Sequence, residues 1–142
     1  MLEKYVPNFD SDEFLQELAS ENGITKKEAM KICQKKIKLE TYFQEKVKDG
    51  LKRQFPDAYV AKIAQGAYSQ SGIPDILCIL DGHYFGFEIK RPVLGKVTKL
   101  QSATINKIRA AGGTAEVVIW PEEAAEIIKN WRIGKNGQRE TG

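Results

Sequence analysis

The spacing of hydrophobic positions predicts helices in the N-terminal part of the chain. Apolar residues recur there every three or four positions, which places them on one face of a helix. The pattern covers three segments, residues 10–22, 25–37 and 39–55. Gly23 ends the first helix, and Thr25 with Glu28 forms a capping box that begins the second. No strong breaker separates the second helix from the third, so we place this boundary between Lys36 and Leu39.

The middle of the chain changes to the composition of β-strands. Residues 59–65 (YVAKIAQ) predict a first strand, and the polar, glycine-bounded segment 66–72 predicts a loop. Two apolar segments then flank Asp81-Gly82, a dipeptide favoured in two-residue turns between antiparallel strands. We therefore expect the second and third strands to form a hairpin within residues 71–92.

The last third of the chain predicts a helix, a strand and a final helix. Thr98 and Gln101 form another capping box, for a helix that ends at Gly112-Gly113. Residues 115–120 (AEVVIW) predict a fourth strand. Residues 121–131 predict the final helix, with a proline and two acids in its first turn, and the residues after it are expected to fray.

The hairpin turn fixes which residues face each other across the second and third strands. With Asp81-Gly82 as a two-residue turn, Leu80 pairs with His83, and each further step along both strands gives the next pair. Asp75 then lies directly opposite Glu88. Their Cβ atoms are expected to lie about 5 Å apart.

Side chains alternate between the two faces of a strand, so the hairpin has two different faces. One face is apolar apart from a histidine at its tip: Ile76, Cys78, Leu80, His83, Phe85, Phe87 and Ile89. The other face carries Asp75 and Glu88, with Lys90 two residues further along and Gly86 expected to leave open space.

Two facing carboxylates repel each other, and a divalent cation between them would relieve this repulsion. Oxygen ligands suit Mg²⁺, which binds one or two carboxylates and completes its shell with water and phosphate oxygens. With Lys90 beside the ion, this set of groups can hydrolyse phosphodiesters. The alternative is structural: Lys90 forms a surface salt bridge with Glu88, and Asp75 caps a turn after Pro74.

The composition indicates a globular protein of one domain. The chain has 142 residues, enough for one domain with its own core, and its 42% hydrophobic and 29% charged residues are typical of a globular protein. Cys33 and Cys78 predict neither a disulfide framework nor a zinc cluster and favour a reducing interior. Without a signal peptide or an apolar stretch of roughly 20 residues, we expect a cytoplasmic protein with no membrane partner.

Charge is compatible with a nucleic-acid partner. The net charge is +3, and lysines and arginines cluster within residues 26–38, 90–96 and 131–139. His83 is the sole histidine of the sequence, which disfavours nucleases of the HNH and ββα-metal classes, because these use histidines as ligand and base.

Several motifs together resemble the VRR-NUC domain of the PD-(D/E)XK nuclease superfamily. They are Gly72-Ile73-Pro74-Asp75-Ile76, Phe87-Glu88-Ile89-Lys90, the helix start from Thr98 to Gln101, and Gly112-Gly113 before a valine-rich strand. The resemblance extends from about Leu39 to Trp120. It implies an α/β fold with a restriction-endonuclease-like core, in which a central mixed sheet is flanked by helices in the order αβββαβ. It also implies that the protein cuts DNA with Mg²⁺ or Mn²⁺.

The resemblance also implies roles for individual residues. Asp75, Glu88 and the main-chain carbonyl of Ile89 would be metal ligands, and Lys90 would be the catalytic lysine. The family places a glutamate, followed four residues later by a glutamine, on the helix before the first strand. Glu40 with Gln44 fits this pattern, so we prefer Glu40 over Glu45 as a further catalytic and metal-binding residue. Gln101 is either the capping partner of Thr98, a catalytic residue, or both.

Five residues are expected to contact DNA: Lys62, Gln44, Arg91, Lys96 and Lys99. Alternation along the first strand exposes Lys62, and the basic cluster after the third strand supplies Arg91 and Lys96. The sequence departs from the arginine-bearing version of the family motif, because Arg91-Pro92 follows Lys90 and Pro92 ends the strand.

We divide the chain into an N-terminal helical extension (1–38), a nuclease core (39–130) and a C-terminal tail (131–142). Single-domain members of the family are similar in fold to Holliday-junction resolvases. The resemblance therefore implies a homodimer that cuts branched DNA such as four-way junctions. Two alternatives stay open. The first is a non-catalytic DNA-binding protein that uses residues 11–37 as a helix-turn-helix. The second is a metal-dependent nuclease on flaps, linear DNA or RNA.

Overall fold

The structure of the chain is a computed structural model that describes residues 11–64 and 72–141. The helices are α1 (Ser11–Asn22), α2 (Lys26–Lys36), α3 (Glu40–Gln54), α4 (Lys99–Ala110) and α5 (Pro121–Thr141). The strands are β1 (Tyr59–Lys62), β2 (Ile76–Leu80), β3 (His83–Ile89) and β4 (Thr114–Val118). From α3 to β4 the elements follow the predicted αβββαβ order. The predicted loop 66–72 lies outside the described residues except for Gly72.

The helix starts agree with the sequence signals. At the start of α2, the Thr25 hydroxyl accepts a hydrogen bond from the Glu28 N–H, and the Glu28 carboxylate accepts one from the Thr25 N–H. Thr98 and Gln101 form the same reciprocal pair at the start of α4. Both capping boxes are therefore confirmed.

The last helix is longer than the sequence predicted. We expected it to end at residue 131 with a frayed segment after it, but α5 continues to Thr141. Arg132 Nε lies 3.3 Å from Asp81 Oδ2, and Lys135 Nζ donates a 3.4 Å hydrogen bond to the main-chain carbonyl of Asp81. These contacts attach the second half of the helix to the β2–β3 turn, and they explain why the expected end at residue 131 was wrong.

The four strands form one mixed sheet in the order β1-β2-β3-β4. β2 is antiparallel to β1 and to β3, whereas β3 and β4 are parallel. Leu80 faces His83, as predicted, and the backbone of Asp81 (φ 53°) and Gly82 (φ 74°) has the positive φ values of the expected hairpin turn. The predicted fold class, a mixed sheet flanked by helices, is confirmed.

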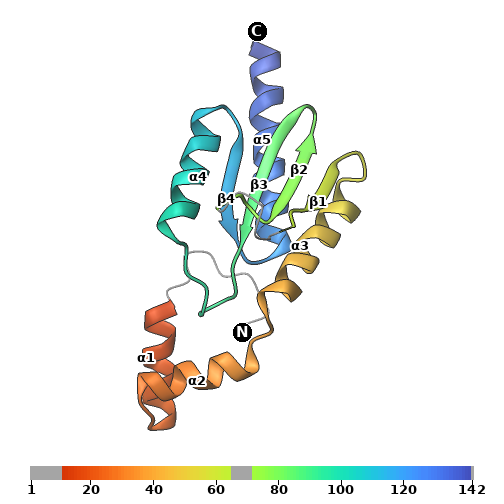
Figure 1. The fold of residues 1–142 in the computed structure, drawn as a ribbon. Helices are drawn as coiled ribbons and strands as arrows, with labels where there is room; N and C mark the ends of the chain where they lie inside the picture. Colours follow the sequence, from red (N-terminus) through yellow and green to blue (C-terminus); the bar gives the residue numbers. More distant parts are fainter. Residues whose placement is uncertain (1–10, 65–71, 142) are drawn as a thin grey trace.

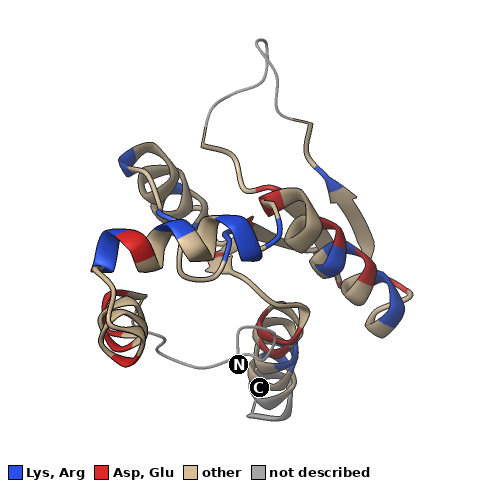
Figure 2. Ribbon diagram, turned by 90° about the horizontal axis from the view of Figure 1, so that it is seen from below, with Lys and Arg blue, Asp and Glu red and all other residues tan. Residues whose placement is uncertain are grey.

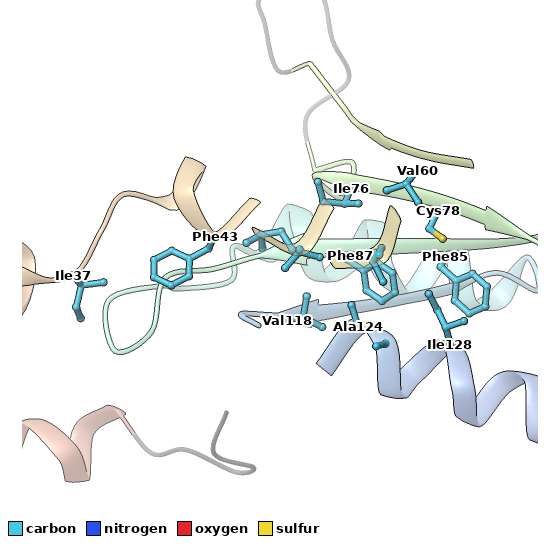
Figure 3. Close-up of a cluster of buried hydrophobic side chains, with 14 of the residues drawn as sticks. Ile37, Phe43, Val60, Ile76, Cys78, Phe85, Phe87, Val118, Ala124 and Ile128 are labelled. Carbon is cyan, nitrogen blue, oxygen red and sulfur yellow. The ribbon is translucent and has the colours of Figure 1, made fainter. Parts of the chain in front are cut away.

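The sheet lies between two layers of helices (Figure 1). α3 and α5 pack together and cover one face, while α4 lies on the other. The apolar face of the hairpin is buried apart from the partly exposed His83 at its tip, with Cys78, Phe85 and Phe87 inaccessible to solvent. Figure 3 shows these side chains beside Ile128 of α5, with Phe43 of α3 further along the same hydrophobic cluster. The predicted apolar face is therefore the main core of the molecule.

The N-terminal helices α1 and α2 pack mainly against each other. Leu15 and Ala19 of α1 and Ala29 and Cys33 of α2 are buried. In Figure 1 the pair lies beyond the end of the sheet at which β3 finishes. Within the described ranges, no helix has the length and apolar character required to cross a bilayer.

Candidate active site

The two acids of the hairpin meet at the end of the sheet. Ile76 and Phe87 form the last pair of the β2–β3 ladder, so the next step brings Asp75 opposite Glu88. Asp75 is 7% exposed and Glu88 is 2% exposed. The backbone N–H of Ile89 donates a 2.8 Å hydrogen bond to Asp75 Oδ2, and the Asp75 carbonyl accepts one of 2.7 Å from Ile63 N–H. The Asp75 carboxylate is thus anchored beside β3, and its backbone is tied to the end of β1.

Only one of the two carboxylate oxygens of the buried Glu88 has a polar partner among the described residues. Its Oε1 accepts a 2.8 Å hydrogen bond from Gln101 Nε2 and lies 3.6 Å from Lys90 Nζ. Its Oε2 is buried, with no hydrogen-bond partner among the described residues. Burial first, and then the negative charge of Asp75, raise the pKa of Glu88 to about 7, although Lys90 acts in the opposite direction. A buried carboxylate oxygen without a partner is costly. It is therefore a position at which a ligand would add a favourable contact.

Glu40, which we preferred over Glu45 from the sequence, lies next to Asp75 and Glu88. It is the first residue of α3, and its Oε1 lies 3.9 Å from Lys90 Nζ. Partial burial and the charge of Asp75 raise the pKa of Glu40. Glu45, the competing choice, instead lies 2.6 Å from Lys48 and 3.6 Å from Lys62. The structure therefore brings Glu40, and not Glu45, to the acidic pair.

Gln101 forms the predicted cap with Thr98 and also contacts Glu88, while its catalytic role stays a prediction. Its Oε1 accepts a 3.0 Å hydrogen bond from Thr98 N–H, which completes the helix cap, while its Nε2 donates to Glu88. The amide has one acceptor oxygen and one donor nitrogen, so a single orientation satisfies both contacts. The start of α4 is thereby attached to the acidic site.

The space above Gly86 is filled, which corrects one prediction. A Cβ atom at this position would lie 2.5 Å from the hydroxyl of Tyr84 and 2.9 Å from Cγ of Pro74. Gly86 therefore allows Tyr84 to lie flat along the strand. Tyr84, Gly86 and Glu88 share one face by simple alternation, so this pattern would have identified Tyr84 as a neighbour of the site.

The five residues expected to contact DNA differ in their exposure to solvent and in their contacts within the protein. Lys96 and Lys99 are exposed between β3 and the start of α4. Lys62 is exposed but lies near Glu45, and Gln44 is buried on α3. The Arg91 guanidinium donates hydrogen bonds of 2.9 and 2.8 Å to main-chain carbonyls in the α2–α3 linker. DNA contact by these residues stays a prediction.

The donor set suits a hard divalent ion. Among the described residues, no three His, Cys, Asp or Glu side chains gather into a complete metal site. Mg²⁺, however, typically takes one or two carboxylates and fills its shell with water and phosphate oxygens. Asp75 with the unpartnered Glu88 Oε2 meets this requirement. The nitrogen and sulfur donors lie elsewhere: His83 bonds to Thr114 and stacks on Trp131, and both cysteines are buried.

Comparisons with known proteins add one structural match. No family model matches the chain, and no curated protein matches it. A solved structure described as a VRR_NUC domain is similar to this chain, with 25% sequence identity and a TM-score of 0.49. The match covers 61% of this chain and 94% of that structure. The description of that structure names the same domain whose motifs the sequence resembles.

Proposed function

We propose that this protein is a divalent-metal-dependent nuclease that hydrolyses phosphodiester bonds in DNA. One observation carries the proposal: a buried pair of facing carboxylates, Asp75 and Glu88, has an unpartnered oxygen and a lysine ammonium 3.6 Å from Glu88. A structural salt bridge would leave no reason to bury two acids side by side. A metal-binding site needs this excess of negative charge.

Asp75, Glu88 and the main-chain carbonyl of Ile89 would hold Mg²⁺ or Mn²⁺. When bound, the ion would polarise the phosphoryl oxygen and lower the pKa of a water molecule. Lys90 is 14% exposed in its side chain and lies between Glu88 and Glu40, so its ammonium group is held at the edge of the site. It would orient the attacking water or stabilise negative charge that develops on the phosphate.

Glu40 and Gln101 complete the site from two helices. Gln101 binds Glu88 Oε1, which leaves Oε2 as the oxygen that would bind the metal ion. Glu40 would accept a hydrogen bond from a water bound beside Lys90. Both α3 and α4 begin here, and helix N-termini favour anions such as phosphate.

The finer proposal is that the substrate is branched DNA, such as a four-way junction, and that a homodimer cuts it. Support comes from the sequence resemblance to single-domain nucleases similar to junction resolvases. Two identical sites would cut two strands symmetrically, which fits a dimer. The exposed Lys96 and Lys99 would bind phosphates beside the acidic site.

The test is a cleavage panel with four-way junction, flap, linear duplex and RNA, each with Mg²⁺, Mn²⁺ or EDTA. We expect the junction to be cut best and EDTA to abolish cleavage. Asp75→Asn, Glu88→Gln and Lys90→Ala should each remove most activity. Glu45→Gln, a charge-matched change on the same helix as Glu40, should retain it. Full activity in any of the first three variants would refute the assignment.

The same panel separates nuclease function from simple DNA binding through α1 and α2. A binding protein without activity would hold junction DNA equally well after Glu88→Gln and would produce no new DNA ends with any metal. Calorimetric titration of Mg²⁺ in the presence of substrate gives an independent answer. Metal uptake by the wild-type protein that is lost in Glu88→Gln supports the proposed site.

A further inference from the structure

A second candidate site lies on the opposite side of α3 from Glu40. It is a surface pocket of about 380 Å³, bounded by the end of α2, the α2–α3 linker and the first turns of α3. Pro92 and Trp120 close it from the sheet side. Glu40 and Tyr42 are two positions apart on a helix, which turns them about 200° from each other. The pocket is therefore separate from the acidic site, although both lie around the start of α3.

The pocket concentrates positive charge. Lys36, Lys38 and Lys46 line it. Within residues 11–64 and 72–141, none of these ammonium groups forms an ion pair with a carboxylate. Figure 2 shows the basic positions at the end of α2 and in the linker beside the start of α3. Like charges held together repel, so an anion in the pocket would be favoured.

Aromatic rings form the remaining walls. Tyr42 is 37% exposed, and Nζ of Lys38 and Lys46 lie 5.2 and 5.3 Å from the centroid of its ring. Trp120 packs with its ring inclined at 75° to Phe43, at a centroid distance of 5.4 Å. Lysines next to an aromatic surface are the combination that proteins use for single-stranded nucleic acid, where ammonium groups bind the backbone and rings receive bases.

The linker that forms one wall is fixed before any ligand arrives. Arg91 donates its two hydrogen bonds to the carbonyls of Ile37 and Lys38. The same β3 extension carries Lys90 of the acidic site and Pro92 of the pocket. Lys90 and Pro92 are two residues apart, so at most about 7 Å of chain separates them. A strand whose phosphate lies at the acidic site would therefore reach the pocket.

We propose that this pocket binds an unpaired nucleotide of the DNA strand, beside the phosphodiester that is cut. Lys38 and Lys46 bind its phosphate, and the exposed Tyr42 ring receives its base. This inference rests on the proposed nuclease function, and it adds a preference for substrates with unpaired nucleotides near the cleavage point. Lys36, which also lines the pocket, adds positive charge.

The test measures DNA binding in EDTA, so that affinity is separated from cleavage. Fluorescence anisotropy would compare a flap with an unpaired strand and a fully paired duplex of the same length. We expect Lys38→Ala/Lys46→Ala to bind the flap about tenfold more weakly, with a salt slope lower by about 0.7, because one neutralised phosphate of an unpaired strand is lost. Lys107→Ala/Lys129→Ala, which removes the same charge from exposed positions outside the pocket, should stay within about twofold of wild type.

Substitutions of Tyr42 form the second part of this binding test. Tyr42→Ala should weaken flap binding about tenfold and duplex binding little, whereas Tyr42→Phe should bind as wild type. Equal loss in both lysine double variants, or flap binding unaffected by Tyr42→Ala, would overturn the inference. Neither outcome depends on cleavage. A wild-type protein that cuts with Mg²⁺ but shows no pocket effect therefore retains the proposed function and loses only this inference.

Discussion

Gln101 donates a 2.8 Å hydrogen bond to Glu88 while its own carbonyl oxygen accepts from the N–H of Thr98. The first turn of α4 and the central acid of the site are therefore positioned by one amide group. The same residue that the sequence identifies as the partner in a capping box binds Oε1 of Glu88, which leaves Oε2 without a partner among the described residues.

Gln101→Ala should lower cleavage activity more than it lowers stability. We expect metal affinity or activity to fall 10- to 100-fold, as is typical when the partner of a metal ligand is removed. The free energy of unfolding should fall by about 1 kcal/mol through the lost cap. Thr98→Ala is the control, because it weakens the cap but leaves the amide. If both variants lose the same fraction of activity, Gln101 acts only through the helix.

Without metal, the protein should be less stable at pH 8 than at pH 5.5. The pKa of Glu88 rises from 4.5 to about 7 on folding. Its contribution to stability is therefore full below 4.5 and is lost as the pH rises through 7. Over this window we expect a loss on the order of 2 kcal/mol, measured by urea unfolding in EDTA.

Glu88→Gln isolates this effect. The amide cannot ionise, so the pH dependence of its stability should be flatter, although Glu40 and Glu123, whose pKa values are also raised, titrate in both proteins. At pH 8, Mg²⁺ should raise the melting temperature of the wild type and not that of the variant. If the free energy of unfolding changes with pH to the same extent in both proteins, ionisation of Glu88 is not the cause of the pH dependence.

Gly95→Ala should impair catalysis through Lys90. A Cβ atom at position 95 would lie 2.6 Å from Cβ of Lys90 and 2.8 Å from the carbonyl of Arg91. The loop must therefore shift, and the lysine with it. We expect kcat to fall at least tenfold, since a displacement near 1 Å can cost 100-fold. Gly134→Ala, where the new Cβ meets no atom within 4 Å, should leave the rate unchanged. Wild-type kcat in Gly95→Ala would contradict this account.

Arg91→Ala should loosen the α2–α3 linker. Two hydrogen bonds from a guanidinium to main-chain carbonyls are lost, with an expected destabilisation of about 2 kcal/mol. Arg91→Lys should not rescue it, because an ammonium group cannot reproduce the paired geometry. Limited proteolysis at residues 36–39 would report the change, with Arg53→Ala as an exposed control. Weaker DNA binding with an unchanged cleavage pattern would instead support the direct DNA contact predicted from the sequence.

Local signals in the sequence were sufficient for much of the fold. The Asp81-Gly82 turn determines the register of the hairpin by counting, and this placed Asp75 opposite Glu88. The capping pairs at Thr25 and Thr98 gave two helix starts, because their hydrogen bonds join residues only three positions apart. Short-range geometry of this kind is encoded within a few residues.

Contacts between distant segments could not be predicted in the same way. Arg91 reaches carbonyls 53 and 54 residues away, and no local pattern indicates those partners. The extension of α5 depends on Arg132 and Asp81, which are 51 positions apart. Tyr84 is a different case. Alternation would have identified it as a neighbour of the site, but we expected open space at Gly86, and whether a ring fills that space depends on the rotamer of the neighbouring side chain.

The hairpin register also determines how the protein tolerates insertions in β3. Side chains alternate with a period of two, so one residue inserted into β3 would reverse every position after it. An insertion near His83, roughly 17 Å from Glu88 along the strand, would direct this acid into the core and an isoleucine or phenylalanine towards the substrate. We therefore expect single-codon insertions in this strand to abolish function as completely as loss of the acid itself.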